Sequence, residues 1–277
     1  MNPIEVKNLT VGYGSKVLLQ NLNFSVADGE IFIILGGSGC GKSSLLKNLF
    51  GLYQPLAGDV WIEGMNITQA IGQERQDIMT HFGVMYQQGA LFGSMTLLEN
   101  VRLFMEEYTE LDDDEMDLLA RCKLDLVGLL PYANYMPSEI SGGMQKRAAI
   151  ARAMALDPKI LFLDEPSAGL DPITSADLDQ TILDLAKNLG ITFVIVSHEL
   201  ASIYAIADRV IMLDKDTKSI IAQGDPRVLR DTSTDPKVHQ FFNRVMSKEA
   251  AWVNRIQITF AWDYLCLPDL LPFLPWF

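Results

Sequence analysis

The stretch IFIILGGSGCGKSSLLKNL, residues 31–49, decides the fold of this chain. It begins with an unbroken apolar run, which suits a strand buried on both faces of a parallel sheet. A glycine-rich segment and then a helical pattern follow. The glycine-rich segment matches G-x-x-x-x-G-K-[ST], whose backbone N–H groups surround a phosphate at the N-terminus of a helix. An accidental match is expected in about one chain in a hundred of this length, and the strand-to-helix context lowers that frequency.

The residues of this phosphate loop have separate expected roles. We expect Lys42 to reach the β- and γ-phosphates of a nucleotide and the Ser43 hydroxyl to bind Mg²⁺. The alternative is a glycine-rich turn with a chance lysine. The predicted nucleotide-binding residues of the loop are Gly36, Gly37, Ser38, Gly39, Cys40, Gly41, Lys42, Ser43 and Ser44.

A second buried strand pattern, residues 160–163, ends in the carboxylates Asp164 and Glu165. Ligand sites of α/β proteins form at the carboxyl ends of parallel strands. We expect Asp164 to hold the magnesium shell and Glu165 to orient or deprotonate the attacking water. Adjacent carboxylates at a strand end more often cap the next helix, so this assignment depends on the phosphate loop upstream.

The length, charge and cysteine content of the chain exclude several classes of function. The 277 residues, 49% of them apolar, are enough to bury a full core. The net charge of −13 argues against a nucleic-acid partner and against anionic lipid, because both require clustered Lys and Arg. Three cysteines without a CxxC pair suit free thiols in a reducing cytoplasm. With no signal-peptide layout and no long charge-free apolar stretch, we expect a soluble protein.

A third motif, residues 141–145 (Ser-Gly-Gly-Met-Gln), opens a basic amphipathic helix between the other two motifs. It resembles the LSGGQ signature of ABC-type ATPases, with Ile140 for Leu and Met144 for Gln. The resemblance implies a head-to-tail homodimer around ATP, in which Ser141, Gly142 and Gly143 of each subunit cover the nucleotide of the other. Alone, the motif is typical of an ordinary N-capped helix.

Further positions match this family in order and spacing. Tyr13 matches the aromatic residue that stacks on adenine, and Gln87 matches the Q-loop glutamine, a nucleotide contact and magnesium ligand. Residues 167–171 match the D-loop, and His198 matches the switch histidine. The resemblance covers about residues 4–245. It implies ATP hydrolysis with Mg²⁺, and catalytic roles for Glu165, His198 and Lys42.

The implied fold is α/β: a P-loop NTPase core of the ABC type, an antiparallel β subdomain and an inserted helical subdomain. Helical periodicity from about residue 97 to residue 155 predicts the insertion. The acidic run Asp112–Glu115 predicts a helix N-terminus there. We therefore expect an ATPase domain over residues 1–245 and a tail of uncertain structure over residues 246–277.

Residues 87–92, 171–174 and 235–242, with the Gly-Gly-Met of the signature, resemble ATPases of Mce-linked lipid transporters. These include the Mla type, which moves phospholipids between bacterial membranes. This resemblance implies transmembrane permease subunits, a possible place for an Mce-domain protein, and a peripheral location on the cytoplasmic face of the inner membrane. The alternatives are a small-solute importer and a non-transport ABC ATPase. The tail matches nothing in the family, and Gln88 stands where such proteins often carry Ser.

In this family the permease inserts a short helix into a groove between the core and the helical subdomain. We expect residues 89–92 and 95–98 to line that groove, because apolar side chains cluster there next to Gln87. The alternative is that Leu91, Phe92 and Leu97 pack inside the subdomain.

Overall fold

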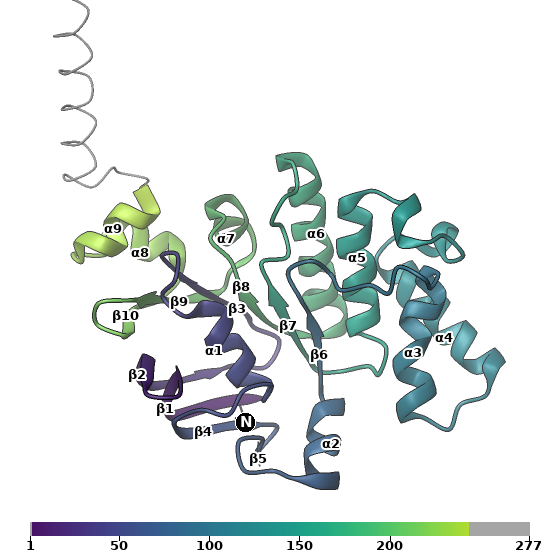
Figure 1. Ribbon diagram of the computed structural model, residues 1–277. Coiled ribbons are helices and arrows are strands. Elements are labelled where there is room, and N and C mark those ends of the chain that lie inside the picture. The colour runs from purple at the N-terminus through teal and green to yellow at the C-terminus, as the bar shows by residue number, and fades with distance from the viewer. Residues whose placement is uncertain (1, 244–277) are drawn as a thin grey trace, which may run out of the picture.

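The computed structural model describes residues 2–243, and its described strands form a four-stranded and a six-stranded sheet (Figure 1). The four-stranded sheet is antiparallel, with the order β2-β1-β4-β5. The six-stranded sheet has the order β10-β9-β3-β8-β7-β6, and β10 is antiparallel to the other strands. The strands are β1 (Ile4–Tyr13), β2 (Lys16–Val26), β3 (Ile31–Gly36), β4 (Ala57–Ile62), β5 (Met65–Asn66), β6 (Phe82–Met85), β7 (Ile160–Asp164), β8 (Thr192–Val196), β9 (Arg209–Asp214) and β10 (Ser219–Gly224).

Helices cover both faces of the six-stranded sheet (Figure 1). They are α1 (Lys42–Leu49), α2 (Gly72–Thr80), α3 (Leu97–Tyr108), α4 (Asp113–Leu126), α5 (Gly142–Ala153), α6 (Pro172–Leu189), α7 (Leu200–Ile206), α8 (Pro226–Thr232) and α9 (Pro236–Asn243), with 3₁₀ turns at Leu130–Tyr132 and Pro137–Glu139. No helix within residues 2–243 is long and apolar enough to cross a membrane.

Side chains of β3 alternate between two hydrophobic clusters, as the period of a strand requires. Phe32 and Ile34 pack with α1 and the antiparallel sheet, whereas Ile33 and Leu35 pack with the helices on the opposite face. All residues of β3, β7 and β8 are buried, so the predicted continuous apolar runs do form central strands. The helix that follows the phosphate loop is therefore enclosed between the two sheets.

Capping side chains set where the helices of the inserted region begin. Asp112 accepts from the backbone of Glu115, whose side chain in turn accepts from Asp112, which confirms the predicted helix start. Thr96 and Glu99 form the same capping box at α3. The helices α3, α4 and α5 occupy the stretch that the sequence predicts to be helical. The predicted tail, residues 246–277, lies outside the described residues.

Gly83 of β6 allows the C-terminal end of α5 to lie against the strand. A Cβ added at Gly83 would lie 1.9 Å from the Ala153 carbonyl oxygen and 2.8 Å from a methyl carbon of Leu161. Because the closer atom belongs to the backbone, the clash cannot be relieved by a side-chain rotation.

We therefore predict that Gly83→Ala lowers the free energy of unfolding by about 1–3 kcal/mol or more, measured by urea denaturation. Gly93→Ala is the matched control, because a Cβ there would meet nothing within 4 Å, and it should change stability by less than about 0.5 kcal/mol. Equal midpoints for the two variants would contradict the packing argument.

Candidate nucleotide site and subdomain groove

The phosphate loop connects the end of β3 to the start of α1, and its glycines are required by its geometry. Gly36 has φ +149°, and a Cβ there would lie 2.5 Å from the Leu213 carbonyl oxygen. Gly41 is the N-cap of α1 with φ +102°, and no side chain caps the helix. The first N–H groups of α1 therefore face the loop without a side-chain acceptor, which is the arrangement that binds a phosphate.

Two side chains at the start of α1 contact groups that the sequence predicts to act with them. The Lys42 amine donates to the carbonyl oxygens of Gly36 (3.0 Å) and Gly37 (3.3 Å), so it lies over the loop. The Ser43 hydroxyl donates to Asp164 Oδ1 at 3.0 Å. A hydroxyl and a carboxylate are the hard oxygen donors that Mg²⁺ prefers. The structure thus brings together two of the three predicted magnesium ligands.

Gln87, the third predicted magnesium ligand, lies on the exposed segment after β6. Its backbone carbonyl accepts a hydrogen bond from the Lys146 amine. Within residues 2–243, its side chain makes no hydrogen bond to Ser43 or Asp164. The structure therefore does not join Gln87 to the other two ligands.

Glu165 and His198 meet at the carboxyl ends of the neighbouring strands β7 and β8. Glu165 Oε2 lies 2.7 Å from His198 Nδ1, and the Glu165 N–H donates to the Val196 carbonyl at 2.9 Å. Glu165 has φ +50°, a conformation that costs a non-glycine residue on the order of 1 kcal/mol. The strand pairing holds this conformation, so the predicted base is fixed beside the predicted switch histidine.

Tyr13 ends β1 with its ring about half exposed (49%). Its hydroxyl lies 2.9 Å from Ser44 Oγ, and the Tyr53 ring packs edge-on against it at 5.6 Å. An aromatic face fixed next to the first turn of α1 can stack on a planar base. The adenine contact of Tyr13 stays a prediction.

A hollow of about 400 Å³ lies beside the phosphate loop, between the β1–β2 turn and the β9–β10 turn. Three lysines line it, Lys16, Lys215 and Lys218, although the chain as a whole is acidic. Positive charge there attracts an anionic nucleotide. The sequence did not predict these lysines, because no motif connects the β1–β2 turn with the β9–β10 turn, which follows some 200 residues later.

The signature residues lie at the N-terminus of α5. Ser141 Oγ accepts from the Met144 N–H at 3.3 Å, and Ser141 and Gly142 are exposed. A Cβ at Gly143 would lie 2.2 Å from Thr174 Cγ2, so this glycine lets α5 pack against the start of α6. In the described part of the chain, no hydrogen bond or ion pair joins the signature to the phosphate loop, and the strands of the sheet lie between α1 and α5 (Figure 1).

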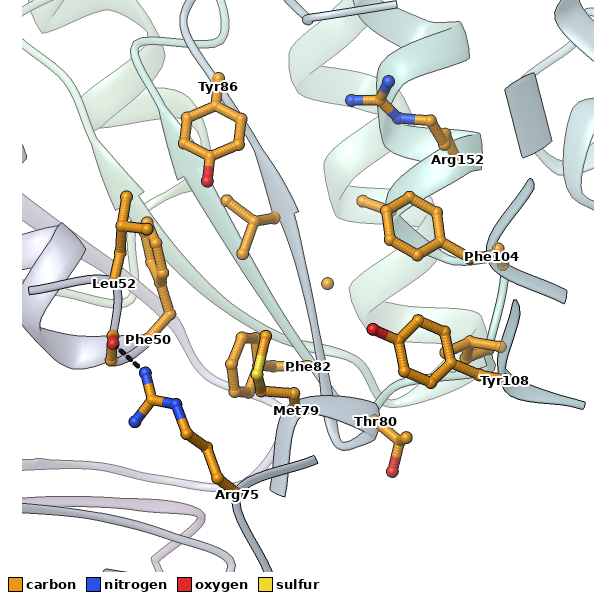
Figure 2. A pocket seen from close by; sticks show the side chains of 16 residues that line it. Phe50, Leu52, Arg75, Met79, Thr80, Phe82, Tyr86, Phe104, Tyr108 and Arg152 are labelled. Carbon is orange, nitrogen blue, oxygen red and sulfur yellow. Dashed lines mark hydrogen bonds between the residues drawn. The ribbon is translucent and has the colours of Figure 1, made fainter. Parts of the chain in front are cut away.

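A groove of about 300 Å³ lies between the core and the helical region. Figure 2 shows Phe104 and Tyr108 along one side and Phe50, Leu52 and Tyr86 along the other. The Arg75 guanidinium donates to the Gly51 carbonyl and so fixes one end of the wall. Most of the lining is apolar, and it comes from residues 50–52, 75–86, 104–108 and 152–156.

The predicted lining, residues 89–92 and 95–98, was wrong for this groove. Leu97 is 1% exposed, and Leu91 packs against the same cluster. Phe92 is exposed, but its ring faces the Arg152 guanidinium. The buried Asn100 binds the backbone of this segment, as described below.

Comparisons with known proteins agree with this geometry. The family described as ABC transporter matches residues 19–168. The probable ribonucleotide transport ATP-binding protein Mkl of Mycobacterium leprae is 41% identical over 240 residues, or 87% of this chain and 68% of that protein. The intermembrane phospholipid transport system ATP-binding protein MlaF is 39% identical in Haemophilus influenzae (87% of this chain, 90% of MlaF). MlaF of Escherichia coli is 35% identical (88% and 90%).

Solved structures show the same fold. A dimeric bacterial ABC transporter cassette superimposes with a TM-score of 0.72 at 31% identity, over 80% of this chain and 98% of that one. The dimeric post-hydrolysis state of an ATP-binding cassette, bound to ADP and Pi, gives a TM-score of 0.70 at 30% identity, over the same shares. The chain is therefore an ATP-binding cassette ATPase and belongs to the ABC transporter family. The predicted fold class and the resemblance to Mla-type ATPases are confirmed.

The Cys40 thiol gives a direct measure of how the phosphate loop is packed. It is buried, and burial raises its pKa although the nearby Lys42 charge acts in the opposite direction. A higher pKa leaves less thiolate near neutral pH, and burial restricts access. Cys122 is exposed.

We predict that Cys122 reacts with maleimide about tenfold or more faster than Cys40 near neutral pH. The measurement is peptide mass spectrometry in a Cys266→Ser background, since Cys266 lies outside the described residues. In denaturant the two thiols should react alike, which is the control. Equal rates in the native protein would show that the loop is packed differently.

Proposed function

We propose that this chain is the ATP-hydrolysing subunit of a transporter that moves phospholipids at the bacterial inner membrane. The observation that carries the proposal is the similarity to MlaF, which extends over 90% of that protein. Mkl, named for ribonucleotide transport, is slightly more similar in sequence, but the chain spans only about two thirds of it. We therefore prefer the phospholipid cargo to a small-solute cargo.

The proposed chemistry follows from the contacts of the site. The phosphate loop, Lys42 and the start of α1 bind the phosphates, while Tyr13 stacks on the base. Ser43 and Asp164 would hold Mg²⁺ together with Gln87, and the ion would neutralise charge on the transferred phosphoryl group. Glu165 orients the attacking water or accepts its proton.

His198 completes the proposed catalytic group. Its Nδ1 atom lies 2.7 Å from Glu165 Oε2, so it fixes the direction of the carboxylate toward the reacting water. Its exposed position allows the ring to contact the γ-phosphate as well.

A homodimer supplies the rest of the site. Ser141, Gly142 and Gly143 lie at a helix N-terminus on the surface, away from the phosphate loop of their own chain. A head-to-tail partner would place these N–H groups on the γ-phosphate. The dimeric cassettes that superimpose on this chain support the arrangement.

The groove suits a short amphipathic helix of a transmembrane permease subunit. Apolar and aromatic side chains line it, which is what a helix-in-groove contact needs. Docking there would place the subunit peripherally on the cytoplasmic face of the inner membrane. An Mce-domain protein is proposed as a further partner of the complex, through the permease.

Glu165→Gln should retain ATP binding but lose about 10²–10⁴-fold in turnover, because a general base contributes that much. The ATP-bound variant should accumulate as a dimer, which light scattering measures. Lys42→Ala is the comparison, since it should weaken ATP binding and give no dimer. Wild-type turnover in Glu165→Gln would refute the assignment of Glu165.

Leu52→Glu tests the groove, because Leu52 is an exposed residue of its wall. The variant should lose the co-purified permease, since docking would bury an unpaired charge, yet the isolated subunit should still bind ATP. Leu118→Glu on α4 is the matched control, because Leu118 is exposed outside the groove.

Retention of the permease by Leu52→Glu would contradict docking at this groove. Mass spectrometry of the wild-type complex tests the cargo separately. We expect bound phospholipid, whereas a complex with a small-solute-binding protein and no lipid would contradict the phospholipid assignment alone.

A further inference from the structure

The segment that follows β6 is bound by two cationic side chains of α5. The Lys146 amine donates to the Gln87 carbonyl. The Arg152 guanidinium donates from Nη2 to the Gly89 carbonyl at 3.0 Å and from Nη1 to the Ala90 carbonyl at 2.5 Å. Three backbone acceptors, one on the Q-loop glutamine and two just after it, therefore depend on one helix, which begins at the signature.

Asn100 of α3 binds the next part of the same segment. Its side chain is fully buried, and its amide donates to the carbonyls of Phe92 (3.1 Å), Met95 (3.1 Å) and Thr96 (2.9 Å). Its Oδ1 atom accepts from the Phe92 N–H at 2.8 Å. The segment is thus held by α3 and α5 together.

The attachment changes sharply at Tyr86. Up to Met85 the chain pairs with β7, in register with Leu163. From Gln87 onward the bonds described above come from the helical region. Tyr86 therefore separates a part that is fixed to the core sheet from a part that is fixed to α3 and α5.

The Arg152 side chain is buried between the turn after Gln87 and the groove. It is 6% exposed, its guanidinium lies 6.0 Å from the Phe92 ring centroid, and it also lines the groove (Figure 2). The two residues whose carbonyls it binds both have left-handed backbones, Gly89 with φ +73° and Ala90 with φ +53°. A left-handed backbone is disfavoured for Ala90 but not for Gly89, so the guanidinium stabilises the turn at its one strained residue.

We propose that Arg152 is a positioning residue for ATP hydrolysis. By binding the turn at Gly89 and Ala90, it makes the Q-loop move together with the signature helix, and it thereby sets where the Gln87 side chain lies relative to Ser43 and Asp164. Arg152 is also part of the groove lining, so a helix that docks there would lie against the residue that holds the turn. This inference rests on the role of Gln87 given under the proposed function.

Arg147 provides a matched control on the same helix. Its guanidinium also donates to a backbone carbonyl, that of Val127, at 3.1 Å. That bond stabilises the helical region without touching the Q-loop. Loss of Arg147 therefore reports the purely structural cost of removing an arginine from α5.

The experiment compares Arg152→Met, Arg152→Lys, Arg147→Met and Gln87→Ala in the full-length chain. We expect Arg152→Met to lower kcat about 10- to 10²-fold, because small misplacements of a catalytic ligand have effects of that size. The KM for MgATP should stay within about twofold of the wild-type value, because the phosphate loop is untouched. Amide hydrogen exchange should accelerate in residues 86–96 only. Lysine can donate to one of the two carbonyls, so Arg152→Lys should recover part of kcat. Arg147→Met should retain wild-type kcat.

Wild-type kcat in folded Arg152→Met would overturn the inference, and so would equal losses in Arg152→Met and Arg147→Met. If Arg152→Met does not fold, Arg152→Lys tests the inference instead. A lowered kcat at an unchanged melting temperature would support the positioning role of Arg152, whereas a wild-type kcat would overturn it. Gln87→Ala separates the proposed role of Gln87 from the proposed role of Arg152. Wild-type kcat there removes the proposed role of Gln87, whereas an impaired Gln87→Ala beside an unaffected Arg152→Met overturns the role of Arg152 alone.

Discussion

The parallel pairing of β3, β8 and β7 is the constraint on which the site depends. Ile34 and Asp164 are both in register with Val196. The residues that follow each strand therefore emerge at one edge of the sheet, which brings the phosphate loop, Glu165 and His198 together. The pairing continues past the strand ends, because the Glu165 N–H donates to Val196 and the Ser197 N–H to Ile34. These bonds hold Glu165 in its left-handed conformation.

The same sheet divides the molecule into parts with different roles. The phosphate loop, the predicted magnesium ligands Ser43 and Asp164, and the Glu165–His198 pair all belong to the core. The signature, the bonds that hold the Q-loop and one wall of the groove belong to α3–α5. Between them the buried amine of Lys146 donates to Gln87 and lies in the electrostatic field of Glu165. Lys146 thus links the helical region to the segment that follows the core strand β6.

Sequence was sufficient where a function lies in contiguous residues. The strand, loop and helix of residues 31–49 are adjacent in the chain, and the order of the later motifs predicted Asp164, Glu165 and His198, which the structure places at one edge of the sheet. It was insufficient for the groove, whose wall combines four separate segments. It also failed for Lys146 and Arg152, because a basic amphipathic helix predicts solvated cations. Both side chains are buried, and their acceptors are backbone carbonyls, which no side-chain pattern reveals.

Arg152 donates its hydrogen bonds to backbone carbonyls, and this indicates what the residue does. Within residues 2–243 no carboxylate pairs with Arg152, so no opposite charge there restores the hydration that this buried cation loses. Burial lowers the pKa of Arg152. The compensation comes from two carbonyl dipoles, the face of Phe92 and the C-terminal end of α5, where a positive charge is favoured. The two carbonyls and the Phe92 ring are in place only when the segment after Gln87 has its observed conformation. Because these contacts require one arrangement of the turn and the helix α5, a displacement of the helix also displaces the turn. An ion pair between two flexible side chains could instead adjust its rotamers and leave the turn in place.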